Sequence, residues 1–227
     1  MHRLLAVTSL VIAVAFPASA DAVLQKARSK AKDGPLYVFN VSVNDGETDF
    51  KLTVDPSKPE GKRVTKITPA PASLKGDAAK RAEALETRTG GDIWCSRFME
   101  NIPANAKRTT ETDTTATFSF TPLPGKNDGR MGDAYKYLNG TVLIDKANGN
   151  VLRYEMTSPK PFKPAAVAKV DRFNFKVTCK PSPDGRTHIE TLDLDLKGSA
   201  MMQAFEQKES RRVSNLQPIA NSGFGTP

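Results

Sequence analysis

The stretch LYVFNVSVNDGETDFKLTV, residues 36–54, decides how the rest of this chain is read. Apolar and polar residues alternate on both sides of the turn sequence Asn44-Asp45-Gly46, and a period of two is the pattern of a β-strand with one buried face. The residues expected on the buried face are Tyr37, Phe39, Val41 and Val43 in the first strand and Phe50, Leu52 and Val54 in the second. The stretch therefore predicts an antiparallel β-hairpin that is packed on one side.

The same alternation returns in the second half of the chain. A second hairpin is predicted over residues 140–158, where Asn148-Gly149 is a preferred two-residue turn. Further strands are expected over residues 115–120, 170–179, 188–196 and about 204–213. Repeated hairpins of this kind build an antiparallel sheet that is covered on one face and wetted on the other.

Short helical segments interrupt the strands. They are expected over residues 22–31, about 77–89, 92–102 and 131–138. In the second segment, Asp77 is the expected N-cap and Gly90-Gly91 the expected end. Because a long meander tends to curl, the predicted fold is mainly β within the α+β class: a strongly curved antiparallel sheet or unclosed β-barrel, with helices covering the concave face.

The N-terminal residues have the layout of a secretory signal peptide. Arg3 precedes an apolar run over residues 4–16, and Ala18-Ser19-Ala20 forms a small-residue end. We therefore expect cleavage after residue 20, a single β-rich domain over residues 21–216 and a disordered tail over 217–227. The protein is expected to be exported, into a bacterial periplasm.

Composition excludes several kinds of chemistry. After residue 20 the chain has one histidine, His188, and two cysteines. The common zinc sites and a cysteine–histidine dyad with a further histidine cannot be assembled from this set. No metal, cofactor or catalytic residue is expected. The formal net charge of +8 is spread along the chain, and an exported protein is not expected to bind nucleic acid; the oligomeric state is not predicted.

The two cysteines allow a single intramolecular pairing, Cys95 with Cys179. Oxidising compartments favour disulfides, and closing a loop of this length is expected to stabilise the fold by about 4 to 5 kcal/mol. The alternative is a papain-like nucleophile at Cys95 served by His188. It would leave Cys179 without a role, so a structural disulfide is the preferred interpretation.

A family resemblance follows from the order of these segments. The stretches TATFSFTP, YLNGTVLIDKANGNVLRYEM, PFKP and VDRFNFKV are similar to the run of strands in the periplasmic LolA-like and LolB-like lipoprotein carriers. The resemblance covers most of the chain after residue 20 in layout. It implies an unclosed β-barrel with helices as a lid over an apolar cavity that receives acyl chains, without a cofactor.

The first functional hypothesis is therefore an exported protein that binds or carries a lipid or acyl ligand in a half-barrel cavity. Face alternation proposes the following lining residues: Phe39, Val41, Phe118, Phe120, Phe173 and Phe175 from strands, and Trp94 and Phe98 from a helical lid. Each of them also fits an ordinary core. A non-catalytic envelope interaction module with a fully packed interior is thus the alternative.

The sequence offers two further candidate sites. Phe162 lies between Lys160 and Lys163 in a proline-rich loop, which would suit a transient contact with an anionic membrane surface if Phe162 were exposed. The alternative is that Phe162 turns inward. A hydrolase could use His188 with Glu190, or Asp193 with Asp195. The preferred interpretation is an exposed histidine beside a turn and, for the two aspartates, the solvent face of a half-buried strand.

Overall fold

The computed structural model describes residues 21–30, 35–125 and 129–219, so the predicted signal peptide lies outside the described residues. The helical elements are α1 (Ala22–Arg28), α2 (Gly76–Arg88) and the 3₁₀ helices η1 (Pro71–Ser73), η2 (Cys95–Asn101) and η3 (Gly129–Tyr137). The strands are β1 (Tyr37–Asn44), β2 (Asp49–Val54), β3 (Val64–Thr68), β4 (Lys107–Glu111), β5 (Thr115–Phe120), β6 (Asn139–Asp145), β7 (Val151–Thr157), β8 (Phe162–Ala165), β9 (Ala168–Pro181), β10 (Thr187–Ala200) and β11 (Gln203–Pro218).

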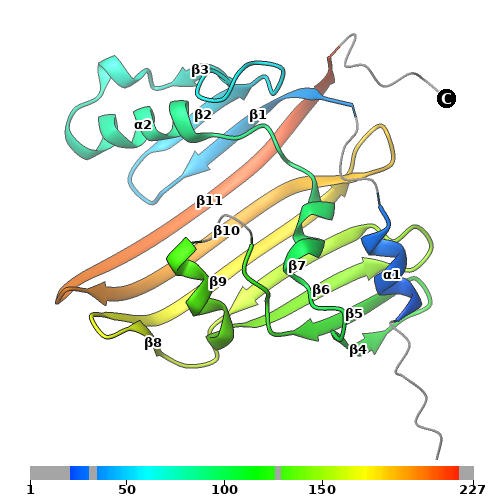
Figure 1. The fold of residues 1–227 in the computed structure, drawn as a ribbon. Coiled ribbons are helices and arrows are strands. Elements are labelled where there is room, and N and C mark those ends of the chain that lie inside the picture. Colours follow the sequence, from blue (N-terminus) through cyan, green and yellow to red (C-terminus); the bar gives the residue numbers. More distant parts are fainter. Residues whose placement is uncertain (1–20, 31–34, 126–128, 220–227) are drawn as a thin grey trace, which may run out of the picture.

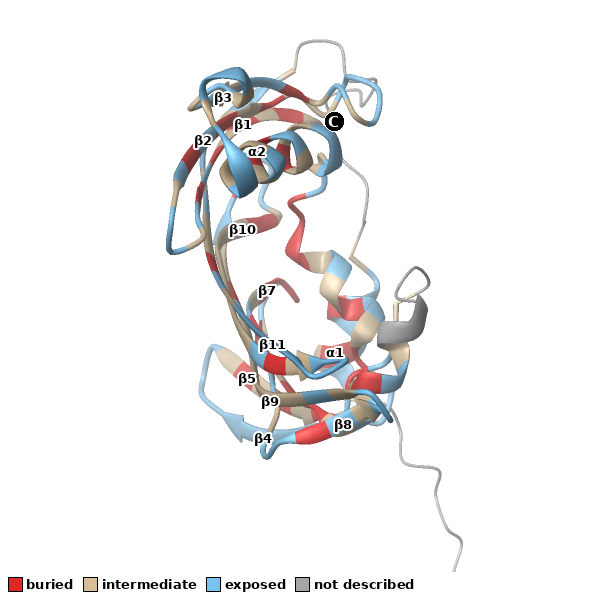
Figure 2. Cartoon of the chain, turned by 90° about the vertical axis from the view of Figure 1, so that its left-hand side faces the viewer, coloured by how far each residue is buried: buried red, intermediate tan, exposed pale blue. Residues whose placement is uncertain are grey.

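All the strands belong to one antiparallel sheet of 11 strands, in the order β3-β2-β1-β11-β10-β9-β7-β6-β5-β4, with β8 beside β9. The last strand, β11, lies between the first hairpin and β10 (Figure 1). In the described part of the chain the edge strands β3 and β4 do not pair with each other, so the barrel is unclosed. Figure 2 shows the sheet bent into an arc with the helices on its inner side. The predicted mainly-β, curved architecture is confirmed.

The opening hairpin forms as predicted. Every apolar residue assigned to its inner face is buried, from Tyr37 to Val54. At the turn, Gly46 has a φ of +89°, a conformation that costs glycine nothing. The Asp45 carboxylate accepts hydrogen bonds from the backbone N–H groups of Glu47 and Thr48, which closes the loop.

Two clusters of buried side chains lie on the concave face. One joins α2 to the first hairpin through Ala82 and Leu85, which pack among residues of β1, β2 and β3. The other joins α1 and η2 to strands β5, β6, β7 and β9, with Leu24 and Ile102 among its most buried members. The helices therefore cover the two ends of the arc.

Three expectations about element boundaries were wrong. The N-cap of helix α2 is Lys75, two residues before the predicted Asp77. Asp77 lies in the first turn, where its carboxylate still complements the helix dipole. Strand β11 runs to Pro218 rather than ending near residue 213, because its last residues pair with the start of β1. Gln217 and Pro218 thus belong to the sheet, and the rest of the predicted tail from residue 220 is not described.

The third error concerns residues 92–102, which were expected to form one helix with Trp94 and Phe98 on a common face. Only Cys95–Asn101 is helical, and it is a 3₁₀ helix. Trp94 is extended and forms an isolated antiparallel bridge with His188. This pairing is incompatible with a helical conformation at Trp94. Trp94 therefore packs in the cluster that contains α2, and Phe98 packs against the cluster that contains α1 and η2.

Cys95 and Cys179 form a disulfide, as predicted. A disulfide fits an extracellular or periplasmic protein, since reducing compartments disfavour it. A search of the described helices finds none with the length and apolar content needed to cross a membrane.

Candidate ligand-binding site on the concave face

Strand register brings the inward-facing side chains into rows that cross the sheet. One row runs from β5 to β1 through Phe118, Val142, Tyr154, Val177, Leu192, Arg211 and Val43. The next row runs through Phe120, Gly140, Met156, Phe175, Leu194 and Glu209. Phe173, Leu196 and Gln207 begin a third. The concave face is thus apolar from β5 to β10 and becomes charged at β11.

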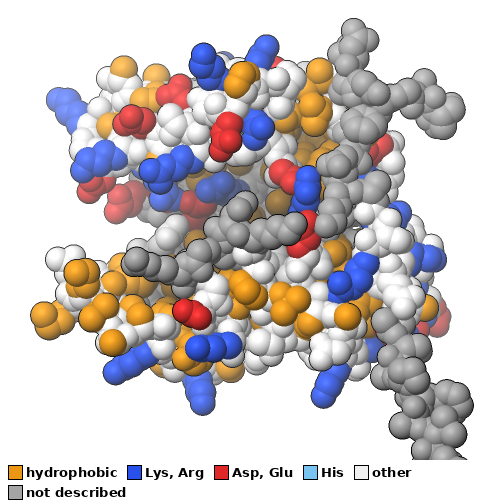
Figure 3. Space-filling view, viewed as in Figure 1, with side chains coloured by type: hydrophobic (Ala, Val, Ile, Leu, Met, Phe, Trp, Pro, Cys, Tyr) orange, Lys and Arg blue, Asp and Glu red, His pale blue; other side chains and the backbone are white. Residues whose placement is uncertain are grey.

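The middle of these rows is incompletely covered. We use "apolar stripe" for five side chains of β9 and β10: Phe173, Phe175, Leu192, Leu194 and Leu196. All five are only partly buried. Among the residues with described side chains, Leu194 and Leu196 pack into neither of the two clusters. Figure 3 shows the surface hollowed between the α2 half of the molecule and the half that carries β8 and η3. Phe175 packs against Phe98 of η2, with 6.2 Å between ring centres, so the uncovered part of the apolar stripe is Leu194 and Leu196.

A small cavity of about 190 Å³ adjoins this stripe under the C-terminal end of α2. Its walls come from the first hairpin, from the segment after α2 and from β10 and β11: Phe39, Val41, Val43, Leu52, Thr89, Gly90, Asp92, Ile93, Ile189, Leu192, Arg211 and Val213. The cavity shares Leu192 with the apolar stripe, so the two form one continuous apolar surface. Arg211 is its cationic wall residue.

Charged side chains fasten α2 to the sheet beside the cavity. Arg81 of α2 pairs with Glu209 of β11, and its Nε lies 3.5 Å from an Asp45 carboxylate oxygen. Glu209 is 7% exposed and also accepts a hydrogen bond of 2.5 Å from Arg211 Nε. A buried carboxylate is costly unless it is paired, so Glu209 needs both arginines. Arg211 consequently sits fixed at the boundary between the charged and apolar parts of the face.

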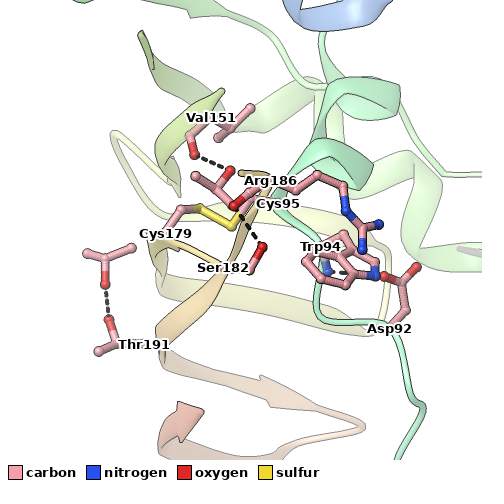
Figure 4. The surroundings of a disulfide bond; sticks show 10 residues. Asp92, Trp94, Cys95, Val151, Cys179, Ser182, Arg186 and Thr191 are labelled. Atoms are coloured by element: carbon pink, nitrogen blue, oxygen red, sulfur yellow. Dashed lines mark hydrogen bonds between the residues drawn. A yellow bond between two sulfur atoms is a disulfide. The ribbon is translucent and has the colours of Figure 1, made fainter. Parts of the chain in front are cut away.

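The segment over residues 92–95, which we call the strap, crosses the concave face between the two clusters. The disulfide attaches it to β9, and the Ile189 N–H donates to the Ile93 carbonyl at 2.8 Å. The guanidinium of Arg186 lies 3.4 Å from the centre of the Trp94 ring (Figure 4), a favourable cation–π arrangement. The Tyr37 ring packs edge-on against the same indole. The strap is therefore fixed, and Trp94 does not face the cavity as a movable lid.

The proposed lining residues separate into two groups. Phe39 and Val41 border the small cavity, and Phe173 and Phe175 belong to the apolar stripe. The other four line neither of these places: Phe118 is fully buried, Phe120 is buried in the same cluster, and Trp94 is covered by Arg186. Phe98 stacks on Tyr154 with 4.7 Å between ring centres and packs edge-on against Phe175 at the margin of the stripe. The structure brings half of the set to one place.

Sequence reasoning missed the residues that link this set. Leu192, Leu194 and Leu196 alternate with aspartates, so the sequence predicts that the three leucines share one face of the strand. It does not predict that this face remains uncovered. Ile189 and Arg211 had no signal in the sequence, because their place depends on β11 lying between β1 and β10.

A second, larger hollow of about 710 Å³ lies at the far end of the concave face. Its lining includes Ala106, Phe120 and Leu123 together with the polar residues Asn105 and Asn139. Gly140 also borders it, and a Cβ there would meet the Phe120 ring at 2.2 Å. This hollow is separate from the apolar stripe and has no charged residue other than Lys107 among its lining residues.

The residues weighed for hydrolysis do not assemble into a site. Asp193 accepts a hydrogen bond from Ser210, and Asp195 is paired with Arg172, as expected for the outer face of the sheet. His188 was expected to be exposed but is buried, because Trp94 pairs with it. Burial, only partly opposed by the Glu190 charge, lowers the pKa of His188. The described residues contain no group of three or more His, Cys, Asp or Glu side chains that could hold a metal ion.

Phe162 also turns inward. It is buried and stacks on Tyr137 with 4.8 Å between ring centres, while Lys160 and Lys163 are exposed. These three residues therefore do not form the exposed apolar tip considered from the sequence, because β8 pairs with β9 and places Phe162 on the covered face.

Searches of protein-family models, of curated proteins and of solved structures found no match for this chain.

Proposed function

We propose that this protein is exported to the periplasm and binds or carries a lipid or another ligand with an acyl chain, which lies along the apolar stripe. The observation that carries the proposal is the position of Leu194 and Leu196: they stand on the covered side of the sheet, yet pack into neither cluster. The LolA-like resemblance points to the same class of ligand.

Energetics support an apolar ligand at this position. Burying an exposed leucine fully is worth about 1.5 to 3 kcal/mol, and the stripe offers five adjacent side chains that are only partly buried. An acyl chain would cover several of them at once. Arg211, at the margin of the stripe, would suit the anionic end of such a ligand, in competition with Glu209.

Cavity size decides how the ligand would lie. Pockets that enclose small molecules usually measure about 300 to 1,000 Å³, and the cavity beside the stripe measures about 190 Å³. A lipid would therefore lie along the open stripe, with only one end in the cavity.

A titration with a fluorescent fatty acid tests the proposal. Saturable binding is expected, and the double variant Leu194→Gln/Leu196→Gln should weaken it by about tenfold or more, since the loss of two apolar contacts of this size exceeds 1.4 kcal/mol. Leu123→Gln is the control, because Leu123 is 44% exposed and borders the larger hollow instead. Equal binding by the wild type and the double variant would contradict the proposed site.

The small cavity volume also favours a second candidate. If the interior accepts no ligand, the protein is a non-catalytic interaction module of the cell envelope. In that case the wild type binds no fatty acid, and a stable partner should be recovered by crosslinking in the envelope.

A further inference from the structure

Two hairpin turns form an exposed apolar tip at one end of the sheet. The turn between β8 and β9 consists of Ala166 and Val167, and the turn between β10 and β11 consists of Met201 and Met202. The Met201 N–H donates to the Val167 carbonyl at 2.8 Å, so the two turns are held side by side (Figure 1). We call these four residues the hairpin tip.

Exposed apolar side chains concentrate at this end. Val167 is 66% exposed, Met201 74% and Met202 100%. With Phe205, which is 37% exposed, they make four of the five large apolar side chains in the described part of the chain that are more than a third exposed. Apolar patches of this kind mark interaction surfaces, and Figure 3 shows apolar side chains gathered at the end where these hairpins project.

The backbone conformation of the tip supports a functional role for Met201 and Met202. Met201 and Met202 have φ values of 49° and 66°. A two-residue turn with both φ values positive strongly prefers Asn-Gly, and a side chain in this region costs about 1 to 2 kcal/mol per residue. The chain thus holds two large apolar side chains in strained positions where they contact solvent. Strain of this kind points to a function.

The charged residues around the tip indicate that its binding partner is anionic. Residues 159–170 and 197–205 contain Lys160, Lys163, Lys169 and Lys197 and no aspartate or glutamate. Lys197 pairs with Glu206, which follows the second range. Lys163 and Lys169 line a hollow of about 610 Å³ between the turns, together with Val167, Met201 and Met202. Lys169 also pairs with Asp171, which lies just beyond the tip. Apolar side chains surrounded by lysines complement a bilayer surface that carries anionic lipid.

We infer that the hairpin tip docks this protein on anionic membrane surfaces, with Val167, Met201 and Met202 entering the interface and the neighbouring lysines contacting lipid phosphates. The inference does not depend on lipid carriage. If the protein carries a lipid, docking at the hairpin tip defines which end of the apolar stripe faces the bilayer. The Phe205 ring lies against Gly198 on the same face as Leu196. An apolar path therefore leads from the tip towards the apolar stripe.

Flotation with vesicles tests this inference. The purified protein is mixed with vesicles of phosphatidylethanolamine and about one-third phosphatidylglycerol, and it is expected to float with them and to be released by salt. The variant Met201→Asn/Met202→Gly supplies the residues that the turn prefers. It should unfold at an equal or higher urea concentration and lose about tenfold or more in vesicle affinity.

Further variants separate the contributions. Lys163→Gln/Lys169→Gln should weaken binding and reduce its dependence on salt. Leu123→Gln removes another exposed apolar side chain, 44% exposed and distant from the hairpin tip in the sequence, and should bind as the wild type does. Leu194→Gln/Leu196→Gln should also float, which distinguishes docking from ligand binding. The inference is overturned if the wild type does not float, if Met201→Asn/Met202→Gly floats equally well, or if vesicles of phosphatidylcholine alone bind as strongly.

Discussion

The pKa of His188 depends on the environment of its side chain. It is the only histidine in the part of the chain that the structure describes, and it lies in the bridge that ties the strap to β10. Burial lowers its pKa, against the smaller opposing effect of the Glu190 charge. The neutral imidazole is thus the form that the folded protein accommodates, while the unfolded chain takes up a proton near pH 6.5.

The free energy of unfolding should therefore depend on pH through His188. Its contribution is complete above about pH 6.5 and is lost as the pH falls from there towards the lower pKa of the folded state, because only the unfolded state then binds the proton. Urea unfolding at pH 7.5 and at pH 5.5 measures this loss. His188→Gln should show a smaller decrease between the two pH values. An identical decrease in both proteins would show that His188 does not cause it.

Residue faces were predictable, but degrees of burial were not. Phe118 and Leu194 both alternate with polar neighbours, and both point to the concave face as expected. Phe118 is fully buried, whereas Leu194 is only partly buried. The difference arises from which helix lies over each strand, and alternation within a strand carries no information about that.

At the scale of elements, the positions of turns were predictable, but their lengths were not. Asn148 and Gly149 lie in the turn between β6 and β7 as predicted, but the loop spans residues 146–150 instead of two residues. Gly149 has a φ of +75°. It also lies against α1, so that a Cβ there would meet Lys26 Cγ at 2.8 Å and the Ala27 nitrogen at 3.1 Å. The turn and the first helix therefore constrain each other.

Gly149→Ala is expected to lower the free energy of unfolding by about 2 to 4 kcal/mol, since it adds contact with α1 to backbone strain. Gly46→Ala is the matched control. Gly46 has a similarly positive φ of +89°, but nothing lies within 4 Å of the added Cβ, so only about 1 to 2 kcal/mol should be lost. Urea unfolding of both variants measures the difference. Equal losses would show that α1 does not pack closely on this turn.

The strap and β8 show where element prediction fails. Residues 92–102 have a helical spacing of apolar residues, but the pairing of Trp94 with His188 and the bond from Cys95 to Cys179 override it. The proline-rich stretch at Phe162 was interpreted as a loop, yet it pairs with β9 as a short edge strand. In both cases a partner distant in sequence determines the local conformation.

At the scale of the whole molecule, long-range contacts join the two halves. Strand β11 pairs with β1 and so attaches the first hairpin to the rest of the sheet. The disulfide holds the strap across the same boundary, and its cysteines are 84 positions apart in the sequence. The curved sheet and the disulfide were predictable from alternation and cysteine count. The strand order was not, because no local pattern specifies that the last strand joins the first.

Removing the disulfide should therefore affect the whole fold. The double variant Cys95→Ala/Cys179→Ala is expected to lose about 4 to 5 kcal/mol of unfolding free energy, because an unfolded chain without this loop closure gains conformational entropy. Urea unfolding measures the loss, and the wild type under reducing conditions should match the variant. A loss below about 1 kcal/mol would show that the strand pairing holds the strap without the disulfide.

The central claim is that the apolar stripe holds an acyl chain in the native protein. Native mass spectrometry of the protein purified from its own envelope, followed by organic extraction, tests it most directly. The account predicts a species heavier than the polypeptide, an acyl lipid in the extract, and a marked decrease of both in Leu194→Gln/Leu196→Gln. A wild-type protein that carries no extractable lipid, or a variant that carries as much as the wild type, would contradict it.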